Sequence, residues 1–309
     1  MEIVSGMHNI NARHHGCVLT IGNFDGVHRG HKMVVDELCE KGRAMGVPSA
    51  LITFEPQPRE FFRGSEVPPR LTRLREKVFL LSRTGLDRLI LLPFNERTAR
   101  TPAPWIAREL CHGMLGCRHV IAGDDFRFGK DRLGDYALLE SMGADLGYTV
   151  SQMPTMQDDG ERISSTRVRR NLALGDFDTV ERLLGHEYFI MGRVVYGRQL
   201  GRQLGVPTAN IRLQRYRAAL EGVYCVCVDG IDEREYHGIA NIGVRPTVDG
   251  KEPLLEVHVF DYSGNLYGQL LKIRFKKKLR DEQAFASIDA LKAQIEQDID
   301  TARDWFGAS

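Results

Sequence analysis

Short apolar runs alternate with longer amphipathic segments along the first 185 residues. Residues 17–22, 49–54, 87–94 and 118–123 are almost continuously apolar and rich in Val, Ile and Leu, which is typical of buried parallel strands. The segments 31–46, 72–85 and 103–113 carry apolar residues at helical spacing and end at or near glycine. This alternation predicts a doubly wound α/β domain, in which ligands bind beyond the carboxyl ends of the strands.

From about His186 the pattern changes to strands without intervening helices. Strand-like runs cover residues 188–197, 222–230, 235–243, 253–261 and 269–278, and turn residues separate them. Residues 287–307 then have helical periodicity, with Ser287 as the expected cap. We therefore predict a small antiparallel β-barrel with a C-terminal helix over residues 186–309, after an α/β domain over residues 1–185.

Composition narrows the class of protein. The 309 residues include 42 basic and 41 acidic side chains, so the net charge is too small to attract nucleic acid or an acidic membrane to the protein as a whole. Six scattered cysteines form no Cys-x-x-Cys pair, which favours reduced, buried thiols over a zinc site or a disulfide scaffold. The first residues lack the apolar core of a signal peptide, and no run is long enough for a membrane span. We expect a cytoplasmic protein, and the sequence makes no prediction of its oligomeric state.

The stretch GNFDGVHRGH, residues 22–31, is the first candidate site. His28 and His31 are three residues apart at the start of a predicted helix, so both imidazoles are expected on one face. The helix N-terminus favours an anion, and glycines let a phosphate approach the main chain. The local pattern leaves two alternatives to a phosphate site: surface histidines without a ligand, or a metal site with two histidine ligands.

Two further strings carry groups suited to phosphate or flavin. ISSTRVR offers hydroxyls and arginines at a probable helix start, although simple helix capping with solvated arginines would give the same pattern. In GDDFRFG, acid and arginine alternate with Phe126 and Phe128, which suits a flavin or nucleotide, or core packing of one ring.

These strings, with IGNFDGVHRGH and TFEPQP, resemble in order the nucleotidylyltransferase-type module of bifunctional riboflavin kinase/FMN adenylyltransferases. GRQLGVPTANI, GVY, NIGVRPTV, LEVHVFDYSGNLYG and the last helix resemble the riboflavin kinase module of the same family. The resemblance implies a flavin-cofactor enzyme that phosphorylates riboflavin to FMN and adenylylates FMN to FAD. It implies riboflavin, FMN and ATP as substrates and Mg²⁺ as the cofactor.

The resemblance also implies roles for particular residues. In the adenylyltransferase module, His28 and His31 would stabilise charge during catalysis. The phosphates of ATP would lie against Gly22, Asn23, Asp25, Gly30, Ser164, Ser165, Thr166 and Arg169, and the flavin against Asp125, Phe126 and Phe128. In the kinase module, Gly201 and Gly205 would approach ATP, and Thr208 and Asn210 would hold Mg²⁺ through side-chain oxygens. Glu256 would be the general base.

Two alternatives remain. One is a nucleotidylyltransferase with a single activity, whose barrel is only a binding module. The other is a flavin-binding regulator in which both sites have decayed.

Overall fold

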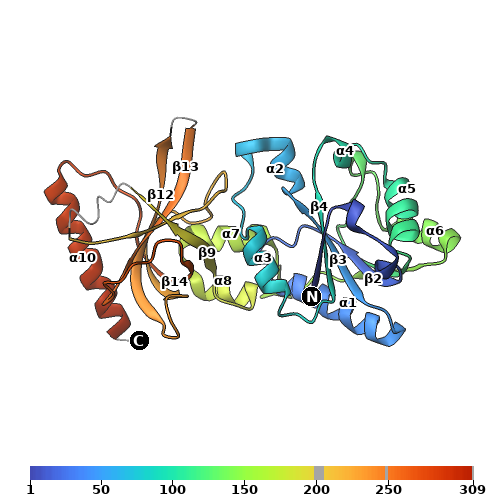
Figure 1. Cartoon of the computed structure of the whole chain (residues 1–309), viewed down its shortest axis with the longest axis horizontal. Helices are drawn as coiled ribbons and strands as arrows, with labels where there is room; N and C mark the ends of the chain where they lie inside the picture. The colour runs from blue at the N-terminus through green and yellow to red at the C-terminus, as the bar shows by residue number, and fades with distance from the viewer. Residues whose placement is uncertain (198–204, 248–249, 308–309) are drawn as a thin grey trace. The chain divides into compact units, whose positions relative to one another are not determined.

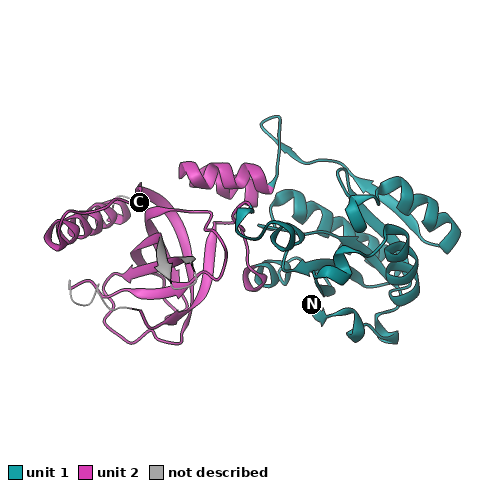
Figure 2. Ribbon diagram, turned by 90° about the horizontal axis from the view of Figure 1, so that it is seen from above, with its two compact units in different colours: residues 1–67, 77–164 teal, residues 68–76, 165–309 magenta. Residues whose placement is uncertain are grey.

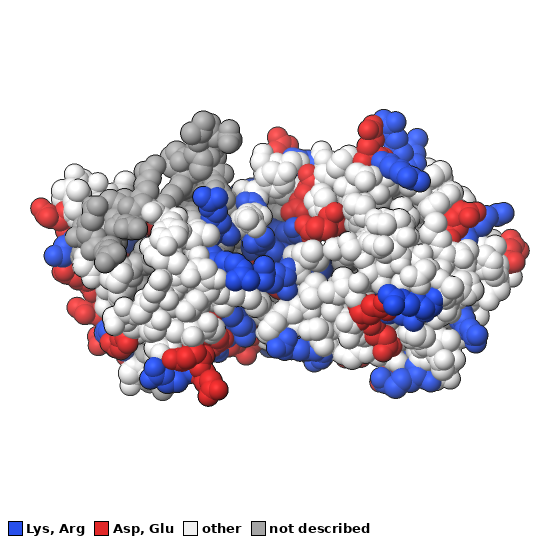
Figure 3. All heavy atoms as spheres, in the orientation of Figure 1, with Lys and Arg blue, Asp and Glu red and all other residues white. Residues whose placement is uncertain are grey.

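The computed structural model describes residues 1–197, 205–247 and 250–307, which fall into two compact units (Figure 1, Figure 2). Unit 1 comprises Met1–Val67 and Lys77–Ser164, and unit 2 comprises Pro68–Glu76 and Ser165–Ser309. Within the described ranges, no helix combines the length and apolarity that crossing a membrane requires. Basic and acidic side chains both occur on the face shown in Figure 3, in keeping with the formal charge of +1.

Unit 1 is built on a six-stranded parallel sheet with the order β1-β4-β3-β2-β5-β6. The four apolar runs form its central strands, as predicted. The edge strands β1 and β6 were not predicted, because they are short and carry polar residues. The strands are β1 (Glu2–Ser5), β2 (Cys17–Ile21), β3 (Ser49–Glu55), β4 (Arg88–Pro93), β5 (Cys117–Gly123) and β6 (Thr149–Met153).

Helices cover both faces of this sheet, which confirms the doubly wound prediction (Figure 1). Leu19 of β2 packs in one core with Leu110 and Leu139, while Val18 faces a second core with Leu38. The helices are α1 (Arg29–Met45), α2 (Pro58–Arg63), α3 (Leu74–Leu81), α4 (Glu96–Ala99), α5 (Ala103–Trp105), the π-helix Ile106–Met114 and α6 (Tyr136–Leu146). A short hairpin, β7 (Gln157–Asp158) and β8 (Glu161–Arg162), follows the sheet.

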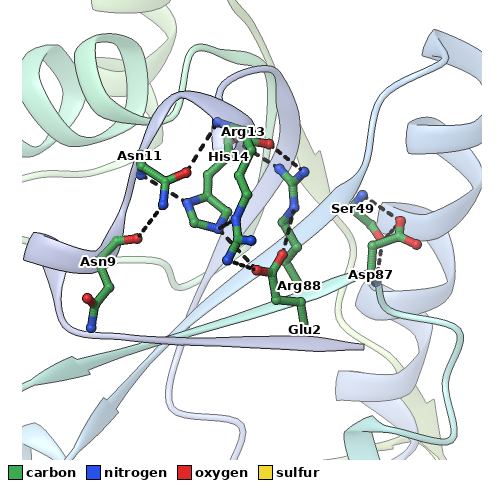
Figure 4. Close-up of polar contacts among 8 residues, drawn as sticks. All are labelled: Glu2, Asn9, Asn11, Arg13, His14, Ser49, Asp87 and Arg88. Atoms are coloured by element: carbon green, nitrogen blue, oxygen red, sulfur yellow. Dashed lines mark hydrogen bonds and ion pairs between the residues drawn. The ribbon is translucent and has the colours of Figure 1, made fainter.

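The amino-terminal edge of the sheet is held by a network of paired charges (Figure 4). Glu2, at the start of β1, forms ion pairs with Arg13 at 2.7 Å and Arg88 at 3.7 Å. Arg88 also donates to the carbonyl oxygen of Arg13 at 2.8 Å. Asp87 accepts hydrogen bonds from the backbone N–H and the hydroxyl of Ser49 at 2.9 and 2.8 Å. This network fixes the starts of β1, β3 and β4, at the end of the sheet opposite the predicted ligand site.

Unit 2 is built around a closed antiparallel barrel with the strand order β10-β13-β12-β11-β14-β9, as predicted (Figure 2). Its strands are β9 (Phe189–Val195), β10 (Ala209–Arg212), β11 (Gly222–Asp229), β12 (Tyr236–Thr247), β13 (Gly250–Val259) and β14 (Leu270–Arg280). Helices α7 (Ser165–Leu174) and α8 (Phe177–Leu184) belong to the same unit. The division of activities between residues 1–185 and 186–309 stays a prediction, because the compact units reflect contacts within the fold and do not show where each reaction takes place.

The C-terminal helix α10 (Ile288–Gly307) covers the outer face of the barrel. The Ser287 hydroxyl accepts a hydrogen bond from the Ala290 N–H at 3.1 Å, which confirms the predicted cap. Ala302 and Ile299 pack with Cys225, Ile239 and Phe260 of the barrel. The amphipathic pattern of residues 287–307 therefore arises from burial against the barrel.

A segment of the first half, Pro68–Glu76, packs within unit 2. The carboxylate of Glu76 is fully buried, and it accepts hydrogen bonds from the Met191 N–H at 3.0 Å and from Arg215 at 3.5 Å. Arg215 also donates to the carbonyl oxygen of Arg70 at 3.0 Å. A buried ion pair thus joins this segment to residues far along the sequence.

Candidate active sites

The first candidate site lies at the carboxyl end of β2, where the order of the sheet reverses. Strands β3 and β4 follow on one side of β2, and β5 and β6 follow on the other. In doubly wound folds, ligands usually bind where the loops that leave two such neighbouring strands diverge, here the loops after β2 and β5. Residues 22–28 follow β2, and residues 124–135 follow β5.

The two histidines lie together at the start of α1, as predicted. His28 is the N-cap, and its Nδ1 accepts a hydrogen bond from the backbone N–H of His31 at 3.2 Å. The two rings stack with centroids 3.6 Å apart and planes 13° apart, and Phe24 lies against His31 at 4.9 Å. The loop before them holds Phe24 and Val27 at positive φ, a conformation that non-glycine residues seldom adopt. The loop is thus shaped around the imidazole pair.

The surroundings of His31 disfavour its protonated form. Burial, followed by the proximity of His28, Lys77 and Arg162, holds the pKa of His31 well below its ordinary value of 6.5. The buried Lys77 donates from Nζ to the carbonyl oxygen of Asn23 at 2.6 Å and to the Thr53 hydroxyl at 3.2 Å. An anion is the ligand that would relieve this concentration of positive charge.

The remaining predicted residues of this loop line the same turn. Asn23 is exposed, Asp25 is buried, and Gly22 donates its N–H to the carbonyl oxygen of Ile52 at 3.0 Å. A Cβ added at Gly30 would lie 3.3 Å from Nδ1 of His28, a tight contact that would press on the imidazole. Gly30 therefore keeps the main chain accessible beside His28.

The loop after β5 brings its charged and aromatic residues close to the same end of the sheet. Asp125 is exposed and forms an ion pair with Arg162 at 3.0 Å. Phe126 and Phe128 stack with centroids 5.2 Å apart. Phe128 is buried in the core and Phe126 is half-buried, so Phe126 presents the more accessible ring of the pair.

An aromatic hollow also lies in unit 1, and its residues were not predicted. It is lined by Phe61, Phe62, Glu96, Ala99, Arg100, Lys130 and Asp131. The rings of Phe61 and Phe62 pack edge-on against Phe94, which directly follows β4, and the side chain of Phe62 is 66% exposed. Its two cations are paired with carboxylates, Arg100 with Glu96 and Lys130 with Asp131, so the exposed rings are the feature that suits a planar ligand.

The ISSTRVR string spans the start of α7. Ser164 belongs to unit 1 and directly follows Ile163, whose carbonyl oxygen lies 3.8 Å from the position of a Cβ on Gly30. Ser165, Thr166 and Arg169 belong to unit 2, where Arg169 donates to the carbonyl oxygen of Pro69. The structure therefore places Ser164 near the His28 loop within unit 1, whereas the other three are described only within unit 2.

The second candidate site lies on neighbouring strands of the barrel. Asn210 of β10 is directly opposite Glu256 of β13, and Glu256 is directly opposite Asn241 of β12. Residues opposite each other in an antiparallel sheet project from the same face, so the three side chains form one row. The sequence did not predict strand β10, which begins at Ala209, so Asn210 lies in the strand and Thr208 directly precedes it.

Asn210 supplies an oxygen that no group of the protein satisfies within the described residues. Its side chain is 4% exposed, its amide nitrogen donates to the carbonyl oxygen of Thr208 at 3.3 Å, and Oδ1 has no hydrogen-bond partner there. A Cβ on Gly197 would lie 2.5 Å from this oxygen, so the glycine permits the approach of the β9 end. A buried amide oxygen without a donor fits a hard cation such as Mg²⁺.

The loop that carries Thr208 is anchored by a histidine. His258 of β13 bonds through Nδ1 to the carbonyl oxygen of Pro207 at 2.8 Å, and burial lowers its pKa. The half-buried Thr208 follows directly. Gly205 is exposed with φ +80°, and Gly201 lies outside the described residues.

Comparison with known proteins decides the family. Residues 10–167 match the model for FAD synthetase, and residues 184–306 match the model for riboflavin kinase. The chain is 50% identical over 306 residues to the bifunctional riboflavin kinase/FMN adenylyltransferase of Pseudomonas fluorescens, with 98% of this chain and 97% of that protein covered. The chain belongs to the bifunctional riboflavin kinase/FMN adenylyltransferase family.

Two other similarities extend over nearly the whole chain. The family member of Escherichia coli K12 is 46% identical over 308 residues, which cover 99% of this chain and 98% of that protein. A crystal structure titled macrolide-efflux protein, from Streptococcus pneumoniae, is 27% identical with a TM-score of 0.81, covering 99% of this chain and all of that one. Family resemblance thus extends through both halves of the sequence.

Sequence reasoning missed several polar groups in this family member. Lys77 sits within a helical pattern that gives no sign of a buried ammonium, and Arg162 lies in a short hairpin. In the barrel, Asn241 donates to Glu282, and burial raises the pKa of that carboxyl group. Of these groups, only Asn241 lies in a motif that the sequence analysis used, the string NIGVRPTV.

Proposed function

We propose that residues 1–185 of this family member adenylylate FMN and that residues 186–309 phosphorylate riboflavin. The first reaction in sequence converts riboflavin and ATP to FMN and ADP, and the second converts FMN and ATP to FAD and pyrophosphate. This division is supported by one observation. Each family match contains its own group of side chains suited to phosphate transfer. His28 and His31 lie in the first match, and Asn210 and Glu256 lie in the second.

In the adenylylation step, a phosphate oxygen of FMN attacks the α-phosphorus of ATP and pyrophosphate leaves. The reaction needs no protein nucleophile, so position and charge supply the catalysis. His28 and His31, at the positive end of α1, would donate to phosphate oxygens that gain charge in the transition state. Gly22, Asn23, Asp25, Gly30 and Ser164 would shape the nucleotide site, with Ser165, Thr166 and Arg169 from α7. Lys77 and Arg162 support the proposal because they add positive charge near His31.

The flavin of the adenylylation step would bind beside these loops. Asp125 and Phe126 offer a charge and a ring, and Phe128 supports the Phe126 ring from the core. The exposed rings of Phe61 and Phe62 offer a second apolar surface for the isoalloxazine.

In the kinase step, Glu256 would take the proton of the ribityl 5′-hydroxyl as that oxygen attacks the γ-phosphorus and ADP leaves. Thr208 and Asn210 would hold Mg²⁺, and the buried Oδ1 of Asn210 supports this role. Bound there, Mg²⁺ would neutralise charge on the transferred phosphoryl group. Gly205 and Gly201 would let the main chain approach ATP.

We also propose that these reactions take place in the cytoplasm. All six cysteines are free and buried, as the sequence predicted for reduced thiols. The partners would be small molecules rather than nucleic acid or a membrane, as the near-neutral charge suggests.

The test is a time course with purified protein, riboflavin, ATP and Mg²⁺, followed by chromatography of the flavins. We expect FMN to form first and FAD to follow. An adenylyltransferase with one activity would make FAD only from supplied FMN, and a regulator would make neither. Addition of a chelator should stop both steps, and excess Mg²⁺ should restore them; activity that survives chelation would exclude the proposed cofactor.

A further inference from the structure

A second set of metal-ligating side chains lies on the barrel at the hairpin that joins β11 to β12. Cys227 of β11 is directly opposite His237 of β12, and Glu235 precedes β12. One potential ligand atom from each of the three, a sulfur, an oxygen and a nitrogen, lies within 4.8 Å of the other two. Cys227 is buried, while the side chains of Glu235 and His237 are 46% and 44% exposed. The sulfur therefore forms the floor of a site that opens to solvent.

We infer that Cys227, Glu235 and His237 form a binding site for a thiophilic divalent cation such as Zn²⁺. Zn²⁺ binds thiolate sulfur, imidazole nitrogen and carboxylate oxygen, and three protein ligands leave a fourth tetrahedral position for water. The borderline-soft donor set disfavours Mg²⁺ and Ca²⁺, which take oxygen ligands. This site is distinct from the Mg²⁺ position proposed at Thr208 and Asn210.

Two neighbouring groups orient the ligands. Arg274 of β14 donates to Oε2 of Glu235, which turns Oε1 toward Nε2 of His237 at 3.6 Å. The ring of His237 stacks on Phe306 of α10, with centroids 3.9 Å apart and planes 6° apart. Outer contacts that fix a carboxylate and an imidazole are what metal sites require of their surroundings.

The local charge balance permits a cation. Arg274 faces Glu187, Asp229 and Glu235, Lys276 pairs with Glu187 and Lys272 pairs with Asp229, so three carboxylates offset three basic side chains around the site. Burial, followed by the carboxylate of Glu235, raises the pKa of Cys227 to about 12, so the thiol is protonated without metal. Metal binding forms the sulfur–metal bond, breaks the S–H bond and releases that proton to solvent.

The experiment uses the full chain, reduced with a phosphine and titrated anaerobically with Co²⁺ and then Zn²⁺. Cobalt bound to a thiolate gives a charge-transfer absorption band in the near ultraviolet, which reports the ligand independently of enzyme activity. We expect one equivalent of Co²⁺ to produce the band and Zn²⁺ to displace it. Equilibrium dialysis with Zn²⁺ alone measures the stoichiometry.

Matched variants test the ligand set. Cys227→Ser should abolish the band, whereas Cys225→Ser, a buried thiol two residues away on the same strand, should retain it. His237→Gln and Glu235→Gln change half-exposed side chains and should weaken Zn²⁺ binding by at least the 10–100-fold or so that loss of an outer contact costs. His112→Gln, an exposed histidine elsewhere, should bind like the parent.

Several outcomes would overturn the inference. They are the absence of a band in the parent protein, a band that survives Cys227→Ser, and His237→Gln binding as tightly as the parent. Circular dichroism checks the fold of each variant, and if Cys227→Ser does not fold, His237→Gln decides the question.

Discussion

The two candidate sites of this family member differ in the charge of the side chains that they gather. The site in unit 1 gathers the imidazoles of His28 and His31 with the cations Lys77 and Arg162. The barrel site instead gathers amide and carboxylate oxygens, because Asn210, Glu256 and Asn241 are opposite one another on three strands. Under the proposed function, the first site would attract ATP directly, whereas the carboxylate of the second would repel ATP until a cation is bound. The first site would then bind phosphate with its own charges, and the second would depend on a metal ion.

The largest effect that tests this contrast is expected from Glu256→Gln. Removing the proposed proton acceptor should slow riboflavin phosphorylation by about 10²–10⁴-fold, because general-base catalysis typically contributes that much. Adenylylation of supplied FMN should continue at the parental rate, measured by the appearance of FAD. Glu233→Gln, an exposed carboxylate of the same unit, is the control. Unchanged kinase activity in Glu256→Gln would assign that residue a purely structural role.

The next effect is expected from His31→Ala. Loss of one donor to the transition state should reduce the adenylylation rate by about 10²–10³-fold, or roughly 2.7–4 kcal/mol, and FMN should accumulate. His112→Ala removes an exposed histidine of the same unit and should leave the rate unchanged.

His28 needs a different substitution, because it also caps α1. His28→Asn keeps a good cap while removing the imidazole, so it separates helix stability from catalysis. Full FAD production by a folded variant that lacks both histidines would exclude their proposed role.

A smaller effect is expected from Asn210→Ala. Without the buried amide oxygen, the Mg²⁺ concentration that half-saturates the kinase reaction should rise by about tenfold or more, as for weakened metal sites generally. Titration of Mg²⁺ at saturating ATP measures this shift, and the adenylylation reaction of the same variant is the internal control. An unchanged Mg²⁺ requirement would remove Asn210 from the metal site.

The smallest effect is expected from Ser287→Ala. The loss of the α10 cap should lower the free energy of unfolding by about 1 kcal/mol and leave both catalytic rates unchanged. Thermal unfolding followed by circular dichroism measures the change, with the exposed Ser263→Ala as the control. A change in either rate would show that α10 acts on a catalytic site.

Features with a strong local periodicity were predictable from the sequence. The four central strands of unit 1 are buried on both faces and so read as continuous apolar runs. The stacking of His28 and His31 follows from their spacing at a helix start, and the fixed order of the motifs identified the family.

Features that depend on contacts distant in the sequence were not predictable. Glu76 lies in a helical pattern, and only the folded chain places its carboxylate beside Met191 and Arg215. The spacing of the cysteines gave no sign of the group at Cys227, because the hairpin register places His237 opposite it. Residues 106–114 form a π-helix although their pattern is that of an α-helix, and the sequence does not show why.

The buried carboxylate of Glu76 has a consequence for how the protein is made on the ribosome. Glu76 is synthesised early, but its partners Met191 and Arg215 follow 115 and 139 residues later. During that interval the nascent segment Pro68–Glu76 has to remain hydrated, because the surface that buries it does not yet exist. The sequence of unit 1 is thus interrupted by Pro68–Glu76, which packs in unit 2. The native burial of this segment can therefore be completed only after the barrel residues have been synthesised.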